Sequence, residues 1–253
     1  QTQGNPCELD YQWHTNATNV RSYPCRAGKE ERFSQVHGAE CDEKKIKDSD
    51  SNGGACAPFR RLHLCVRNLE NININKNINN DNLLADVCLA AKFEGNSITQ
   101  DYPKYQATYN DSPSKMCTML ARSFADIGDI IRGKDLYLGD NGKDKLEENL
   151  KTIFGKIYDK LDGKKGHKSA KEHYKDESRN YYQLREDWWN ANRKMVWYAI
   201  TCGAGQIDKY FRDACSGGTT ATNKKCRCAT NYVPTYFDYV PQYLRWFEEW
   251  AED

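Results

Sequence analysis

The pattern of hydrophobic and polar positions divides this chain into two unlike parts. Residues 1–80 show little helical periodicity and contain Gly, Ser and Asn stretches. Residues 71–80 alternate Asn and Ile, which fits an edge strand or a lead-in to a helix, and we interpret the alternation as compositional bias. From residue 81 onward, apolar residues recur every three or four positions, the spacing of an amphipathic helix. The pattern predicts a loop-rich N-terminal lobe followed by a helical bundle.

The second part predicts several helices, and glycine positions predict where three of them end. They run from Asp81 or Asn82 to Gly95, from Ser114 to Gly133, over 143–162, over 177–202, over a short stretch at 206–214, and from Pro241 onward. Gly95, Gly133 and Gly163 follow the last apolar positions of the first three helices, where glycine commonly ends a helix. Pro241 suits a first helical position because proline lacks the N–H that a helix leaves unpaired there.

Eleven cysteines are the strongest compositional signal. They are Cys7, Cys25, Cys41, Cys56, Cys65, Cys88, Cys117, Cys202, Cys215, Cys226 and Cys228. Zinc sites use closely paired ligands, and only Cys226 and Cys228 are close, so the spacing favours disulfides over metal. Disulfides imply an oxidising, extracellular compartment. Because eleven is odd, one cysteine has no partner within this chain.

Charge and composition exclude several classes of protein. The chain has 37 basic and 36 acidic residues, a net charge of +1, so any polyanion site must be a local patch. Zinc-finger, RNP-type and basic-zipper signals are missing, which argues against nucleic acid. No apolar run approaches the length of a membrane span, so direct membrane insertion by this segment is not expected. The 6 Trp, 16 Tyr and 8 Phe argue for a folded core.

The sequence names no catalytic, cofactor-binding or metal-binding residues, and we expect no cofactor. The five histidines are scattered, and the adjacent pairs Glu147–Glu148 and Glu248–Glu249 would diverge on a helix. The sequence contains no Cys-x-x-Cys pair, the motif that would indicate a disulfide oxidoreductase. An extracellular glycan-processing enzyme, the remote alternative, would need two carboxylates across a cleft, and no such pair can be named.

Two basic stretches are candidate contact sites. Residues 160–175 hold six lysines against two acids, and residues 57–67 hold three arginines and no acid. Clustered Lys and Arg suit sulfated or sialylated glycans, although a neutral protein has basic areas in any case. The candidate receptor- or glycan-binding residues are Arg60, Arg61, Lys164, Lys165, Lys168 and Lys171.

Several longer strings carry a family resemblance. They lie at 54–65 (GACAPFRRLHLC), 82–88 (NLLADVC), 121–133 (ARSFADIGDIIRG), 188–193 (WWNANR), 197–202 (WYAITC) and 233–253. In this order they resemble the signatures of Duffy-binding-like domains. The strings at 136–139 and 145–158 resemble the alpha class found in the variant erythrocyte membrane protein family of malaria parasites.

The resemblance implies a mainly α, disulfide-rich Duffy-binding-like fold. It implies a variable lead-in over 1–24, a loop-rich disulfide-tied subdomain over 25–80, and a helical subdomain over 81–253, with a third subdomain absent from this chain. Within this scaffold we expect Cys117 and Cys202 to pair, because both lie on long predicted helices. We expect Cys215, Cys226 and Cys228 to make local bridges and leave one thiol for a partner beyond residue 253.

The resemblance also implies a function. It indicates an extracellular adhesion module, displayed on the infected red cell as part of a membrane-anchored adhesin. Its partners would be a host cell-surface receptor or a sulfated or sialylated glycan on red cells or endothelium, including heparan-sulfate-like polyanions, with cytoadhesion or rosetting as the result. It would also be a variant antigen bound by host antibodies. The alternative is an antigenic scaffold or spacer whose neighbouring domains carry the adhesion.

Overall fold

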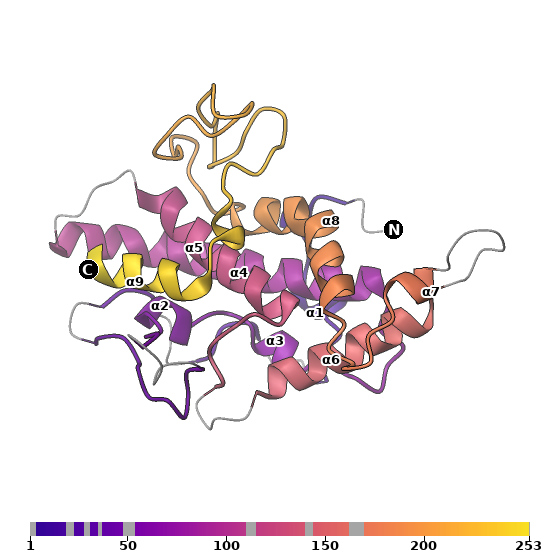
Figure 1. Ribbon diagram of the computed structural model, residues 1–253. Coiled ribbons are helices and arrows are strands. Elements are labelled where there is room, and N and C mark those ends of the chain that lie inside the picture. The colour runs from indigo at the N-terminus through magenta and orange to yellow at the C-terminus, as the bar shows by residue number, and fades with distance from the viewer. Residues whose placement is uncertain are drawn as a thin grey trace.

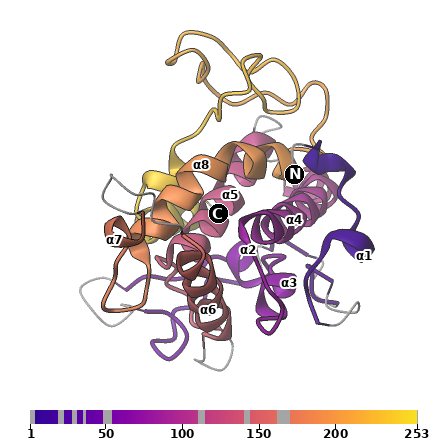
Figure 2. The same ribbon diagram turned by 90° about the vertical axis from the view of Figure 1, so that its right-hand side faces the viewer.

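Three long helices form the centre of the computed structural model. It describes residues 4–18, 23–27, 31–34, 37–47, 54–109, 115–139, 144–161 and 170–252. Helix α4 (Asn80–Tyr109) packs against α5 (Met116–Arg132) and α8 (Tyr182–Ile200), and α5 also packs against α8 (Figure 1; Figure 2). Across these ranges the extended residues form only isolated β-bridges. The expected mainly helical fold is therefore confirmed.

Shorter elements surround this centre. They are η1 (Pro6–Glu8), α1 (Tyr11–His14), α2 (Phe59–Leu62), α3 (Arg67–Glu70), α6 (Lys145–Asp159), α7 (Ala170–His173), η3 (Phe237–Tyr239) and α9 (Gln242–Glu252). Helix α6 packs against α3, whereas α9 and η3 pack against α5. Between α8 and η3 the chain makes a loop that projects beyond the helices (Figure 1, gold). None of the helices in the described ranges has the length and apolar character of a membrane span.

Aromatic side chains fill the contact between α5 and α8. The ring of Phe124 lies 5.1 Å from that of Trp189 and 5.2 Å from that of Trp197, centroid to centroid. Gly128 makes room for this packing, because a Cβ there would lie 2.7 Å from the Trp189 ring. Large aromatic side chains bury much apolar area each, so these few residues stabilise a core in a chain of only 38% hydrophobic residues.

Gly95 does not end a helix, which corrects the expectation for α4. The helix continues through it to Tyr109, with Pro103 inside it. A Cβ at Gly95 would lie 1.8 Å from the carbonyl oxygen of Ile200. The glycine is therefore required by the close approach of the end of α8, rather than by a change of backbone direction.

The other predicted helix ends fare differently. Gly133 does end α5, in the left-handed conformation with a φ of 73°. Ser114 and Gly163 lie outside the described residues. Helices α6 and α9 are confirmed, and α9 begins directly after Pro241. Helix α8 is confirmed but shorter than the predicted 177–202, because Tyr181 before it adopts a φ of 56°.

The predicted helix over 206–214 is wrong, because its backbone groups bond to a distant part of the loop. The Tyr210 N–H donates to Thr222 Oγ1 at 2.8 Å, and the Asp208 carbonyl accepts from the Cys226 N–H at 2.9 Å. These bonds replace the local ones that a helix needs. The Cys215–Cys228 disulfide closes the same loop.

The Asn-Ile stretch is more than compositional bias. Ile72 and Ile78 are buried in the main core, and Ile72 forms an isolated bridge with Ala17. Lys156 of α6 and Lys160, which directly follows that helix, donate to carbonyl groups of the same stretch, Lys160 to that of Ile78 at 3.0 Å. The isoleucines therefore anchor a loop against the core, and no extended strand forms.

Five disulfides connect ten of the eleven cysteines, all of which lie in the described ranges. The bonds are Cys7–Cys202, Cys25–Cys65, Cys41–Cys56, Cys117–Cys226 and Cys215–Cys228. The expected Cys117–Cys202 bond is wrong, because Cys202 at the end of α8 faces the N-terminal segment and Cys117 faces the projecting loop. The unpaired thiol is also not in the 215–228 cluster: it is Cys88, 2% exposed on α4.

Candidate functional site

Arg60 and Arg61 are structural residues in this fold. Their exposed fractions are only 2% and 3%. Arg60 pairs with Glu249 of α9 at 2.8 Å and with Asp126 of α5 at 2.6 Å. Arg61 pairs with Asp135 at 2.5 Å. Because their guanidinium groups are buried against internal carboxylates, they are not available for the surface contact expected of them.

The same buried cluster fixes α9 to α5. Arg245 of α9 donates to Asp126 at 2.8 Å and to Asp129 at 2.5 Å, and the Trp246 indole N–H donates to Asp126 at 3.2 Å. Burial alone would raise the pKa of Asp126, but Arg60 and Arg245 outweigh it and hold that pKa well below its usual range. Paired charges of this kind position helices, whereas an unpaired buried charge would be strongly destabilising.

The predicted lysine patch remains a prediction. Lys164, Lys165 and Lys168 lie outside the described residues. Lys171 is exposed on α7, where its ammonium group donates to the Asp159 carbonyl at 3.3 Å and lies 5.7 Å from the centroid of the Tyr158 ring. Both contacts are at the surface, so Lys171 stays accessible to a partner.

A cluster of exposed tyrosines lies beside α8, and sequence reasoning did not single it out. We define the tyrosine cluster as Tyr232, Tyr236 and Tyr239, each about half exposed. The hydroxyl groups of Tyr232 and Tyr236 are 3.1 Å apart. The guanidinium group of Arg193 lies 5.5 Å from the ring centroids of both Tyr236 and Tyr239. The rings are therefore held in place yet remain accessible, as interface aromatics commonly are.

Helix α9 has one buried face and one exposed apolar face. Trp246 is 1% exposed, whereas Phe247 and Trp250 are 64% and 56% exposed. We define the α9 outer face as Tyr243, Leu244, Phe247 and Trp250. A contiguous exposed apolar face of this kind is typical of a surface that contacts another protein element.

A pocket of about 520 Å³ opens between the N-terminal segment, α8 and the projecting loop. Its described lining consists of Gly4, Asn5, Pro6, Lys194, Met195, Trp197, Tyr198, Arg227, Asn231 and Tyr232. Tyr232 also belongs to the tyrosine cluster, so the pocket and the cluster form one continuous surface. Sites that bind a compact group are commonly apolar cavities of this size with a few polar groups.

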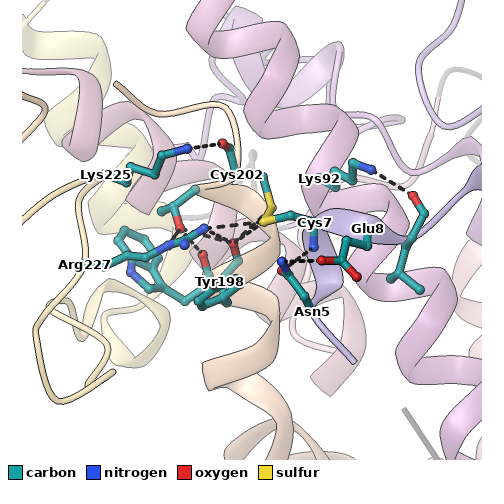
Figure 3. The surroundings of a disulfide bond; sticks show 11 residues. Asn5, Cys7, Glu8, Lys92, Tyr198, Cys202, Lys225 and Arg227 are labelled. Atoms are coloured by element: carbon teal, nitrogen blue, oxygen red, sulfur yellow. Dashed lines mark hydrogen bonds between the residues drawn. A yellow bond between two sulfur atoms is a disulfide. The ribbon is translucent and has the colours of Figure 1, made fainter. Parts of the chain in front are cut away.

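A disulfide and a stacked arginine border the pocket, and Figure 3 shows both of them. Cys7–Cys202 joins the N-terminal segment to the end of α8. The guanidinium carbon of Arg227 lies 3.6 Å from the centroid of the Tyr198 ring. Arg227 donates through Nη2 to the Tyr198 carbonyl and through Nε to Thr201 Oγ1, both at 2.7 Å. Since each wall is tied to α8, the pocket is formed before any partner arrives.

Two cations and no carboxylate occur in the described lining of this pocket. Lys194 is exposed on α8, and Arg227 is half-buried above Tyr198. Burial lowers the pKa of Arg227, although its guanidinium group stays charged at any physiological pH. Neither residue was predicted from the sequence. The one available signal was the position of Arg227 between Cys226 and Cys228, which fixes its backbone.

Comparisons with known proteins agree with the helical, disulfide-tied scaffold. The family model of the Duffy binding domain matches residues 54–245. The solved NTS-DBL1-alpha and CIDR-gamma double domain of the PfEMP1 protein from Plasmodium falciparum is similar, with 41% identity and a TM-score of 0.83 over 100% of this chain and 36% of that chain. A PfEMP1 DBLb domain solved bound to human ICAM-1 is 33% identical, with a TM-score of 0.73 over 99% of this chain and 51% of that chain.

A curated relative extends the likeness beyond PfEMP1. The Duffy receptor beta form of Plasmodium knowlesi is 27% identical over 226 residues, which are 84% of this chain and 16% of the receptor. The chain thus spans only part of each protein that it resembles. Since the family model covers most of the chain, and relatives share its helices and much of its sequence, this chain belongs to the Duffy binding domain family.

Proposed function

We propose that this chain is the receptor-binding part of an extracellular parasite adhesin, and that it contacts a host cell-surface receptor or glycan through the tyrosine cluster and the adjoining pocket. Family membership supports a binding role, and one relative was solved bound to human ICAM-1. Cytoadhesion or rosetting, display on the infected red cell and recognition by host antibodies are the finer parts of this proposal.

One observation carries the proposal. The charges of Arg60 and Arg61 are neutralised inside the fold, whereas Lys194 and Arg227 accompany exposed tyrosines at a preformed pocket. Interfaces are enriched in Tyr, Trp, Met and Arg, and all four residue types line this pocket. A rigid site loses little conformational entropy on binding, which favours a contact here over one on a mobile surface.

Binding of the oxidised chain to red cells and to endothelial cells tests this function. We expect binding that the variant Tyr232→Ser weakens and that Tyr23→Ser, an exposed tyrosine elsewhere, leaves unchanged. Addition of soluble heparin separates two modes of contact, because a basic patch such as that of Lys164–Lys171 would be blocked in a salt-sensitive way. Failure of a folded sample to bind either cell type would favour the alternative, an antigenic scaffold whose neighbouring domains carry adhesion.

We also propose that the α9 outer face packs against the third helical subdomain that the family resemblance implies. Phe247 and Trp250 are far more exposed than large apolar side chains that pack in a hydrophobic core. A longer chain that includes this subdomain should shield Trp250 from acrylamide quenching of its fluorescence. The variant Phe247→Asp should destabilise the longer chain and leave this one nearly unaffected; equal effects on both would refute the proposal.

A further inference from the structure

The pocket beside η1 offers an apolar platform with little free hydrogen-bonding capacity. Pro6, Met195, Tyr198 and Tyr232 supply most of the described walls. The hydroxyl group of Tyr232 already pairs with that of Tyr236 at 3.1 Å. The platform therefore suits an apolar side chain better than a group with many hydroxyls, since buried polar groups need partners.

The amide side chains of the pocket point to the same conclusion. The Asn5 amide nitrogen donates to Glu8 Oε1 at 3.2 Å, and its oxygen accepts from the Cys7 N–H at 3.0 Å. Of the two described amides in the lining, only that of Asn231 has no hydrogen bond to a described residue. A saccharide with a hydroxyl on most ring carbons would leave several of them unpaired.

Two positive groups in the pocket have donors to spare. Within the described part of the chain, Lys194 makes no hydrogen bond or ion pair, and Arg227 uses Nε and Nη2 but not Nη1. No described lining residue is an acid. Charge complementarity therefore favours an anion such as a carboxylate, which can accept hydrogen bonds from Lys194 and from Nη1 of Arg227.

We propose that this pocket binds a segment of a partner protein in which an apolar side chain stands next to a carboxylate. This rests on the proposed receptor-binding function and names the chemistry of the partner. The apolar side chain lies on Met195 and Tyr198, and the carboxylate pairs with Lys194 and with Nη1 of Arg227. The Cys7–Cys202 bond and the Arg227 stack fix both walls, so the segment binds without ordering the pocket.

Methionine methyl NMR tests the proposal, because the chain has only three methionines. Met195 lines the pocket, whereas Met116 and Met119 are buried on α5 and serve as internal references. The probe is the capped dipeptide N-acetyl-phenylalanyl-aspartyl amide, titrated into the oxidised chain. We expect a saturable shift of the Met195 methyl signal alone. The asparaginyl analogue and the alanyl-aspartyl analogue should each bind about tenfold more weakly, because each lacks one half of the recognised chemistry.

A charge reversal locates the carboxylate. Lys194→Glu should weaken binding of the dipeptide by about tenfold, whereas Lys44→Glu, the same charge change at an exposed turn outside the pocket, should not alter it. Unchanged Met116 and Met119 signals will show that the variant is folded. Unchanged affinity in Lys194→Glu would overturn the assignment.

Two further outcomes decide between ligand classes and separate this inference from the function. A Met195 shift with sialyllactose but not with the dipeptide would overturn the peptide class in favour of an anionic glycan. Cell binding by the chain together with no Met195 response to the dipeptide would overturn the pocket assignment while the receptor-binding function stands. Dipeptide binding without any cell binding would support the pocket and refute the function as proposed.

Discussion

Arg60 of α2 and Glu249 of α9 form a buried ion pair with 2.8 Å between Nε and Oε1, although they are 189 residues apart in the chain. The pair closes a cluster with Asp126 that ties the first lobe to the last helix. The basic residues Arg60 and Arg61, which the sequence predicted at the surface, therefore lie in the interior of the molecule. Their ion pairs lead to specific predictions for stability.

Removing the Arg60 side chain should unfold the link between α2 and α9. Arg60→Ala leaves Glu249 and Asp126 buried with fewer partners, and we expect a loss of about 3–5 kcal/mol in the free energy of unfolding. Lys134→Ala is the control, because Lys134 is exposed and its 2.6 Å pair with Glu186 should contribute at most about 1 kcal/mol. Urea denaturation of both variants measures the difference, and similar losses would contradict the structural role of Arg60.

Acid should weaken the same cluster. The folded pKa of Asp126 is lowered, so its stabilising contribution is complete above its unfolded value near 3.8 and is lost as the pH falls below that value. Burial raises the pKa of Asp129 to about 6, although Arg245 and Arg132 lower it. The contribution of Asp129 to the free energy of unfolding therefore increases as the pH falls from about 6 to about 4, which is opposite to the effect of Asp126.

The measurement is the free energy of unfolding from pH 6 down to pH 2. We expect the free energy of unfolding to decline steeply below about pH 4, because, of the two carboxyl groups Asp126 and Asp129, only Asp126 still titrates there. Asp126→Asn should be less stable at neutral pH and should show a shallower decline in acid. Parallel pH profiles for the two proteins would show that Asp126 is not responsible.

Cys88 should be silent until the chain unfolds. Burial raises the pKa of its thiol to about 12, so little thiolate exists at neutral pH, and the residue is only 2% exposed in the folded chain. A thiol-reactive chromophore should report no free thiol per native chain and one per chain in guanidinium chloride. Rapid reaction in the native chain would contradict the assignment of Cys88 as the buried free cysteine.

Gly95 should be intolerant of even one added methyl group. The Cβ of Gly95→Ala would meet the backbone carbonyl of Ile200, which cannot rotate away, and overpacking of this kind costs about 1–3 kcal/mol or more. Gly38→Ala is the matched control, because a Cβ there meets nothing within 4 Å. Thermal unfolding compares them, and an equally stable Gly95→Ala chain would mean that α4 and α8 do not approach as closely as described.

Local patterns predicted the helices well and the long-range contacts poorly. The three-four spacing at 145–159 and the glycine at 133 act within one helix, so they could be interpreted without knowing the fold. Gly95, by contrast, resembles a helix stop until Ile200, which lies more than a hundred positions further along the chain, is placed beside it.

The candidate site illustrates the same division. Arg60 and Arg61 have no acidic residue nearby in the sequence, so they were expected at the surface. Their partners Asp126 and Asp135 come close to them only in the folded chain. The pocket was invisible in the sequence because Asn5, Lys194 and Arg227 come from three distant segments. The disulfide pattern also depends on which helix end faces which loop. The spacing of apolar residues predicts the helices but not how they are placed relative to one another.

The order of the disulfides determines how the molecule would carry a mechanical load. A force applied between Gly4 and Glu252 is transmitted from Cys7 to Cys202 through the first disulfide, and from Cys215 to Cys228 through the second. Tension therefore bypasses residues 8–201, which include all of α4, α5 and α8, and stretches only the segments outside these two bonds. Reduction of Cys7–Cys202 would place the three central helices in line with the force, so the oxidised chain can bear traction with its core unloaded.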